Sequence, residues 1–311
     1  MDDIRDHLEI IIITYNRAVL LHNTMDALLK SPFKMCHISV LNNASTDNTI
    51  EICNSYQNKF PNLTIITNKI NIGGNANILR AIETSNGKYT WVLCDDDEYD
   101  FSYCDDLIEA IIGEKAELIH VGAHTDVPWN FGGNINTPRN LLKNGYSFFR
   151  FSSFLPCNVF KTESFYPYII SCYNNIVNSY PHMPFFISFY EENKNIYITK
   201  NRIVKAVMGY QACPYKDFYL YWLNTALLLK KTSERVIMFR DPFLINSTIK
   251  KIIFPVSVLN TIVHYRFSII NHYNLFGFSI FLLSLILLPM YFLCFCIKEL
   301  YMKLKNHSGI T

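Results

Sequence analysis

The chain has 311 residues, of which 50 % are hydrophobic, enough for one large domain or for one domain with an appendage. Its 28 Lys and Arg nearly balance its 26 Asp and Glu, so nothing in the composition suggests the basic surface typical of nucleic-acid-binding proteins. Nine cysteines without a CxxC pair fit neither a zinc site nor a disulfide framework, and the first segment is too acidic for a signal peptide. We therefore expect reduced thiols and a folded part that stays in the cytoplasm.

Alternating strands and helices are predicted over the first 84 residues. A continuous β-branched run indicates a first strand covered on both faces, and apolar residues at helical spacing follow it. Polar turns with Ser, Thr, Asp or Asn precede the next helices, where these residues favour N-caps. The expected strands are 8–14, 37–41 and 63–67, and the expected helices are 18–30, 50–58 and 76–84. This alternation predicts an α/β fold with a mainly parallel sheet and right-handed crossovers.

A further apolar run, Trp91 to Cys94, ends in four consecutive acids, Asp95 to Glu98. Such a run predicts a buried strand whose carboxyl end emerges where open α/β sheets bind ligands. Carboxylates crowded at a strand end repel one another unless a cation offsets them, and oxygen ligands suit Mg²⁺ or Mn²⁺. The acids therefore predict a divalent metal site, with a solvated acidic loop as the alternative.

Four motifs follow one another in the first hundred residues. They are ITYNR at 13–17, NNASTDNT at 42–49, NIGG at 71–74 with Asn77 behind it, and GKY at 87–89 before Asp95-Asp96-Asp97. Together they resemble the family 2 glycosyltransferases with a GT-A fold, over roughly residues 8 to 100. The residues within these motifs are similar to those of bacterial sugar transferases of O-antigen or capsule assembly, including the abequosyltransferase-like branch. The resemblance implies a Rossmann-like sheet flanked by helices and a nucleotide-diphosphate sugar as donor.

By this resemblance, the end of the first strand holds the donor nucleotide. Thr14 and Tyr15 are expected to hold the nucleobase through the backbone and the ring, with Arg17 in the same donor site; a simple strand-terminating turn is the alternative. Asn42 stands where the family usually has an Asp that binds uracil. An amide both donates and accepts, so uracil and cytosine both remain open.

The third motif is expected to approach the diphosphate. Gly74 permits close backbone approach to a ligand, although a Gly pair is also common in plain turns. The family often has Arg before the Asn that corresponds to Asn77, whereas Ala76 precedes it here and the nearest cation is Arg80.

The acids complete the donor site that the resemblance implies. Asp95 and Asp96 are expected beside the ribose and uridine, and Asp97 as the ligand of a divalent metal, Mn²⁺ or Mg²⁺, that bridges the diphosphate. Such an ion neutralises charge that develops on the leaving nucleoside diphosphate.

Inverting members of the family need a base for the acceptor hydroxyl, often supplied by a Glu-Asp pair that this chain lacks. In its expected place stands YPHMP at 180–184, where Pro181 predicts the start of a helix that runs through Tyr190. We expect His182 in its first turn to be the base, because histidine accepts protons near neutral pH. A packed histidine is the alternative, and Asp217 and Glu163 are further candidates.

Near the C-terminus, residues 275–297 form a run of 23 without a charged side chain, long enough to cross a hydrocarbon core. Pro289 inside the run also allows a re-entrant or interfacial segment, and 252–274 is expected to lie at the interface. The lysines and arginines on both sides do not select an orientation. A buried core helix is the alternative.

We therefore expect a GT-A domain at 1–250, with a donor half at 1–100 and an acceptor half at 101–250, and a membrane-associating helical segment at 251–311. The expected function is an inverting, metal-dependent glycosyltransferase of hexosyltransferase type. It would move a sugar to a lipid-linked saccharide acceptor at the inner leaflet, on the cytoplasmic face of a bacterial inner membrane.

Three other functions remain as alternatives to this expected function. The first is a glycosyltransferase that acts on teichoic acid or a lipo-oligosaccharide core. The second is a sugar-nucleotide-binding scaffold without catalysis, and the third a dinucleotide oxidoreductase. The third is disfavoured because no GxGxxG follows the first strand.

Overall fold

The computed structural model describes residues 3–124, 129–178, 180–205 and 224–240. The chain divides into two compact units, Met1–Cys213 and Pro214–Thr311. The described part of the second unit contains helix α11, Thr232–Arg240. The predicted boundary at residues 250 and 251 lies outside the described residues, so it stays a prediction.

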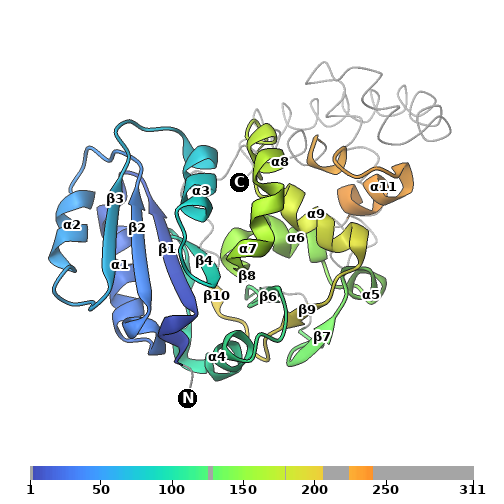
Figure 1. Ribbon diagram of the computed structural model, residues 1–311, viewed down its shortest axis with the longest axis horizontal. Coiled ribbons are helices and arrows are strands. Elements are labelled where there is room, and N and C mark those ends of the chain that lie inside the picture. The colour runs from blue at the N-terminus through green and yellow to red at the C-terminus, as the bar shows by residue number, and fades with distance from the viewer. Residues whose placement is uncertain (1–2, 125–128, 179, 206–223, 241–311) are drawn as a thin grey trace, which may run out of the picture. The chain divides into compact units, whose positions relative to one another are not determined.

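An eight-stranded mixed sheet forms the centre of the first unit, in the order β3-β2-β1-β4-β8-β6-β9-β7 (Figure 1). β1 to β4 are parallel to one another, β8 is antiparallel to both its neighbours, and β7 is antiparallel to β9. The strands are β1 Leu8–Thr14, β2 His37–Asn42, β3 Leu63–Thr67, β4 Tyr89–Cys94, β6 Leu118–His120, β7 Asn134–Asn136, β8 Asn158–Lys161 and β9 Ile196–Ile198. A separate two-stranded sheet pairs β5, Glu98–Tyr99, with β10, Val204–Lys205. The predicted mixed α/β fold with a mostly parallel sheet is confirmed.

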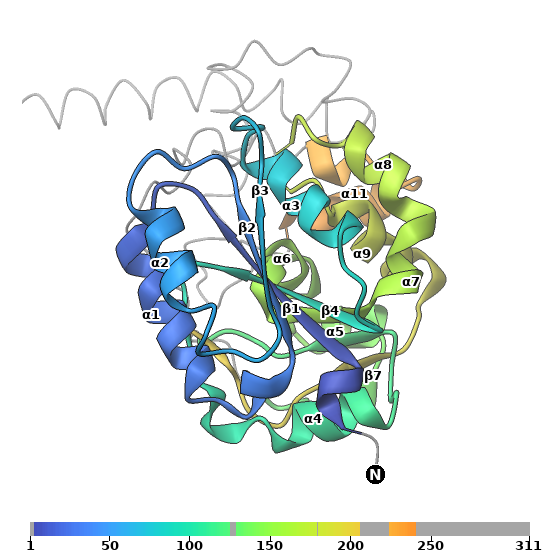
Figure 2. The same ribbon diagram turned by 60° about the vertical axis from the view of Figure 1, so that its left-hand side comes forward.

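Helices cover both faces of the parallel half of the sheet. α1 and α2 lie together on one side, and α3 lies on the other side against β1 and β4 (Figures 1 and 2). α1 buries Leu21, Met25 and Leu28, which recur at helical spacing and produce its apolar face. The helices of the first unit are α1 Ala18–Leu29, α2 Thr49–Ser55, α3 Gly74–Glu83, α4 Asp105–Ile112, α5 Pro138–Lys143, α6 Phe148–Ser153, α7 Thr162–Phe165, α8 Ile169–Asn174 and α9 Met183–Glu192.

The predicted elements of the first half agree with the structure except at their ends. α2 stops at Ser55 instead of 58, because the amides of Tyr56 and Gln57 bond to carbonyls three residues back and tighten the last turn. α3 starts earlier than predicted, at Gly74, after Gly73 with a φ of +84°. Only glycine adopts such a φ readily, so Gly73 sets the start of this helix.

A buried carboxylate joins the amino ends of the central strands and thereby positions β4. Glu9 in β1 is 1 % exposed, and its side chain accepts hydrogen bonds from Ser39 Oγ at 2.7 Å, Asn86 N at 2.6 Å and Gly87 N at 3.1 Å. A Cβ at Gly87 would lie 2.6 Å from the Glu9 Cβ, so only glycine fits there. The turn before β4 is thus held against β1, which fixes where the acids at the end of β4 emerge.

Among the described residues, no helix combines the length and the apolar character that crossing a bilayer requires. The predicted membrane segment, 275–297, lies outside the described residues.

Candidate active site

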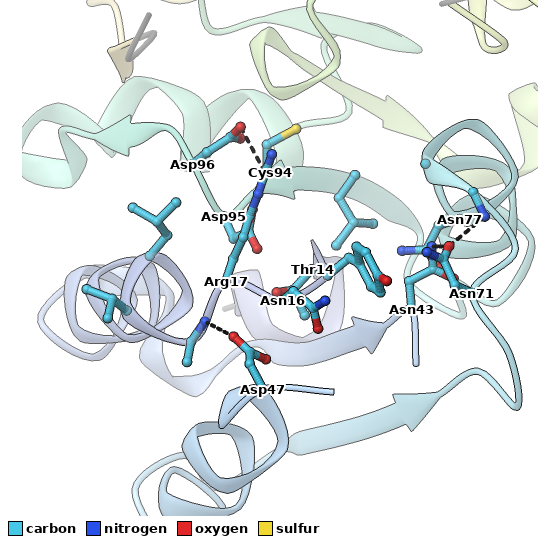
Figure 3. Close-up of a pocket in the computed structure, with 17 residues that line it drawn as sticks. Thr14, Asn16, Arg17, Asn43, Asp47, Asn71, Asn77, Cys94, Asp95 and Asp96 are labelled. Carbon is cyan, nitrogen blue, oxygen red and sulfur yellow. Dashed lines mark hydrogen bonds and ion pairs between the residues drawn. The ribbon is translucent and has the colours of Figure 1, made fainter. Parts of the chain in front are cut away.

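A cavity of about 860 Å³ opens at the carboxyl edge of the parallel strands (Figure 3). Its walls come from the end of β1 and the start of α1, the loop after β2, the loop before α3, and the end of β4. Parallel pairing sets Thr14 beside Asn42 and Ile13 beside Cys94, so segments far apart in sequence end at one edge. This is the edge at which open α/β sheets bind ligands.

At the end of β4, one guanidinium bridges two of the acids. Arg17 Nη1 lies 2.8 Å from Asp95 Oδ1 and 2.8 Å from Asp96 Oδ2. Asp95 is 2 % exposed, and burial raises the pKa of its carboxyl to about 6 although Arg17 favours the charged form. Arg17 therefore offsets the charge of two carboxylates at the cavity wall, as Figure 3 shows.

The same turn presents a set of metal-ligand types that shares Asp96 with this ion pair. The Cys94 Sγ, an Asp96 oxygen and an Asp97 oxygen all lie within 4.8 Å of one another, and the three residues are half-buried. Atoms that bind one divalent ion at about 2.0–2.6 Å lie within roughly 5 Å of each other, so this donor set fits such an ion. Burial and the carboxylates of Asp97 and Asp96 raise the pKa of the Cys94 thiol well above its ordinary value.

A network of asparagine amides builds the opposite wall. Asn43 Oδ1 accepts from Asn68 Nδ2 at 2.8 Å and from Ile72 N at 3.0 Å, and Asn43 Nδ2 donates to Asn71 Oδ1 at 2.8 Å. Asn77 Oδ1 accepts from Asn68 Nδ2, also at 2.8 Å. Asn77 lines the cavity as predicted, but its amide is engaged in holding the loop between β3 and α3.

The glycines of this loop leave room at the cavity. A Cβ built at Gly73 or Gly74 would meet no atom within 4 Å. Position 73 requires glycine because its φ is +84°. Gly74 has neither a positive φ nor a neighbouring atom that a Cβ would meet. Packing therefore does not explain the glycine at position 74.

The loops after β1 and β2 are bonded to each other, which makes this side of the cavity rigid. Asn16, with a φ of 51°, receives a hydrogen bond from Thr46 N at 2.7 Å and donates its own N–H to Ser45 Oγ. Asp47 accepts from the N–H groups of Thr49 and Ala18, at the starts of α2 and α1. Asp47 thus joins the starts of two helices.

Several lining residues were missed by reasoning from sequence. Asn16, Asn71 and Cys94 line the cavity without having been singled out. Apart from glycine, asparagine is among the residue types that most readily adopt a positive φ. Asn16 in the TYNR motif was therefore a signal of the tight turn at the cavity. For Cys94, the only signal in the sequence was its position directly before the run of acids.

The predicted site residues divide into those that line the cavity and those that do not. Thr14, Tyr15, Arg17, Gly74, Asn77, Asp95 and Asp96 line it, and Asp97 lies in the adjoining metal-ligand cluster. Asn42 is 1 % exposed, is not among the lining residues, and turns its Oδ1 to Ser45 N at 3.0 Å. The structure thus does not bring Asn42 to the cavity.

His182 is also absent from the cavity wall. It is the N-cap of α9 rather than a residue of its first turn, it is 2 % exposed, and burial lowers the pKa of its ring to about 4. Its Nε2 lies 3.2 Å from Ser152 O and 3.1 Å from Ser153 O, so it donates to the backbone. This is the geometry of a packed histidine and gives the predicted base no support. Glu163 is exposed on α7, and Asp217 lies outside the described residues.

Residues 9–165, about half of the chain, match the family described as Glycosyl transferase family 2. The chain therefore belongs to glycosyl transferase family 2, and this family places it in the glycosyltransferase class of enzymes. This confirms the family and the enzyme class that the motifs predicted.

Two curated bacterial proteins are similar to part of the chain. The uncharacterized glycosyltransferase YibD of Escherichia coli K12 is 31 % identical over 97 residues, 31 % of this chain and 28 % of that protein. The abequosyltransferase RfbV of Salmonella typhimurium LT2 is 33 % identical over 88 residues, 27 % of this chain and 26 % of that protein. The matched stretches thus span little more than a quarter of these relatives.

Among solved structures, S. aureus TarS 1–349 in complex with UDP-GlcNAc superposes with a TM-score of 0.58. The similarity covers 82 % of this chain and 80 % of that chain at 17 % identity. At this identity the likeness establishes the shared fold.

Proposed function

We propose that the cavity binds a nucleotide-diphosphate sugar together with a divalent ion, Mn²⁺ or Mg²⁺, and that the enzyme transfers the sugar with inversion to a lipid-linked glycan. The observation that carries the proposal is the acidic turn after β4, which adjoins the cavity at the carboxyl edge of the sheet. The TarS complexes with UDP and UDP-GlcNAc support a nucleotide-sugar donor for this fold.

The lining residues define how the donor is held. Thr14 and Tyr15, at the end of β1, are proposed to contact the nucleoside, because Tyr15 is 41 % exposed at the cavity. Gly74 opens α3 and leaves space for phosphate oxygens near its N-terminus, where backbone N–H groups and the helix dipole favour an anion. Arg17 is proposed to keep Asp95 and Asp96 in place rather than to bind phosphate directly.

Asp96 and Asp97 are proposed to hold the metal, which supplies positive charge that stabilises the leaving nucleoside diphosphate. In the transfer, the acceptor hydroxyl bonds to the anomeric carbon, the bond from that carbon to the diphosphate breaks, and the hydroxyl proton passes to a base. Asn42 and His182 have no part in this proposal, because neither lines the cavity.

The acceptor and its location are the most specific parts of the proposal. The uncharged run 275–297 supports attachment to a membrane. The inner leaflet of a bacterial membrane, on its cytoplasmic face, is proposed because nucleotide sugars are cytosolic and a lipid-linked acceptor is available there. The partial similarity to an abequosyltransferase supports a role in O-antigen or capsule synthesis.

The proposal is tested by binding and turnover on the full chain. We expect one class of nucleotide sugar to raise the melting temperature in Mn²⁺ but not in EDTA, since a ligand at a hundredfold excess over its Kd adds about 2.7 kcal/mol. Asp97→Ala should abolish metal-dependent binding and transfer, whereas Glu98→Ala, an exposed acid of the same run outside the cluster, should retain both. Full activity in EDTA refutes the metal, and binding without hydrolysis or transfer indicates a scaffold.

A further inference from the structure

Cys94 is the one member of the metal-ligand cluster that the acidic motif does not include. Of the six cysteines among the described residues, five are buried, and Cys94 alone is partly exposed. It is the last residue of β4, it forms no disulfide, and it lines the cavity beside Asp96 (Figure 3). A half-buried cysteine at the cavity wall contributes less to the core than the five buried ones, so packing alone does not explain its place.

The backbone of Cys94 is held on two sides, which fixes the origin of its side chain. In the sheet it pairs with Ile13 of β1. Outside the sheet, the hydroxyl of Tyr99 accepts a hydrogen bond from Cys94 N at 3.0 Å and donates one to Cys94 O at 2.8 Å. Tyr99 is itself 9 % exposed and stacks on Phe101 at 5.7 Å, so it is a rigid support.

Burial, rather than the ion pair of Arg17, separates Asp95 from the other acids of the turn. Asp95 and Asp96 both pair with the guanidinium at 2.8 Å, but Asp95 is 2 % exposed whereas Asp96 is half-buried. Asp95 therefore stays in the wall, whereas Cys94, Asp96 and Asp97 offer one ligand atom each, and these atoms lie within 4.8 Å of one another. The sulfur, rather than the first carboxylate of the run, thus lies beside the two half-buried acids.

We propose that Cys94 Sγ coordinates the divalent ion together with Asp96 and Asp97. The inference rests on the metal of the proposed function and adds a ligand to it. On coordination the thiol loses its proton to solvent, because a metal-bound thiol is a thiolate. One sulfur among oxygen ligands shifts preference from Mg²⁺ towards softer ions such as Zn²⁺, Co²⁺ and Cd²⁺. The consequence is a site whose metal specificity departs from that of a carboxylate-only site.

Cobalt absorption of the full-length protein separates this inference from the metal site itself. Bound Co²⁺ gives weak visible bands whatever its ligands, and a strong near-ultraviolet band only when a thiolate coordinates it. We expect both bands in the parent protein, loss of the near-ultraviolet band alone in Cys94→Ser, and loss of both in Asp97→Ala. Cys104→Ser, a buried cysteine outside the cluster, is the matched control and should keep both bands.

Visible bands without the near-ultraviolet band in the parent overturn the sulfur ligand and leave the metal site standing. No cobalt binding, by absorption or by calorimetry, overturns the metal site of the proposed function as well. A second variant guards against poor folding of Cys94→Ser. Cys94→Asp offers oxygen in place of sulfur, so the ratio of Cd²⁺ to Mg²⁺ affinity should fall below that of the parent, because the softer ion loses its sulfur ligand and the harder ion gains an oxygen. An unchanged ratio overturns the proposal.

Discussion

His182 should make the protein lose stability between pH 6.5 and pH 4. Burial lowers the pKa of its ring to about 4, from an ordinary value of 6.5. Between these two values the unfolded chain binds a proton that the folded chain does not, so the free energy of unfolding falls as the pH falls. The stability is fully present above pH 6.5 and is lost on the way down to pH 4.

The size of the effect follows from the difference between the two pKa values. At 1.36 kcal/mol for each unit, the complete loss is roughly 3 kcal/mol, and at pH 5 it is about 2 kcal/mol. His120, which is fully buried in β6, has its pKa lowered to about 4 by burial and should add a similar loss.

The assay is urea unfolding at pH 7, 6 and 5, in which the pH dependence of each variant is compared rather than its absolute stability. The loss from pH 7 to pH 5 should be about 2 kcal/mol smaller in His182→Gln than in the parent. His22→Gln, which alters an exposed histidine of α1, is the control and should follow the parent. An equal loss in His182→Gln and the parent refutes the buried neutral ring.

The same variant tests the role that the sequence predicted for this residue. If His182 is only packed in the core, the His182→Gln enzyme should have the same turnover number at pH 7 as the parent enzyme, when both are calculated per folded molecule. A fall of roughly two to four orders of magnitude with unchanged donor affinity would instead restore His182 as the acceptor base.

Two further predictions concern the donor cavity and the C-terminal segment. Gly74→Ala should leave stability unchanged or raise it by about 0.4–1 kcal/mol, because its φ and surroundings accept a methyl group, while donor affinity measured by calorimetry falls. Unchanged affinity would show that no ligand approaches α3 there. Removing residues 270–311 should release the protein from membranes in a sedimentation assay, since the long uncharged run is lost; a truncated protein that still pellets would locate the attachment elsewhere.

Local pattern alone determined the parallel half of the fold. The β-branched run of β1 and the helical spacing of Leu21, Met25 and Leu28 express burial directly, so both elements were predicted almost to the residue. The motifs likewise indicated the carboxyl edge of the sheet, because a polar turn after a buried strand has to emerge there.

Tertiary structure alone decided which polar side chains reach the cavity. Arg17 and Asp95 are 78 positions apart and meet because β1 and β4 are neighbours in the sheet. Asn42 and His182 have side chains suited to the site, yet their polar atoms bond to nearby backbone instead. Residue type states what a side chain is able to do, and the packing of distant segments determines which partner it meets. Cys94 illustrates the converse, since a thiol without a motif becomes a candidate ligand only through its position beside Asp96 and Asp97.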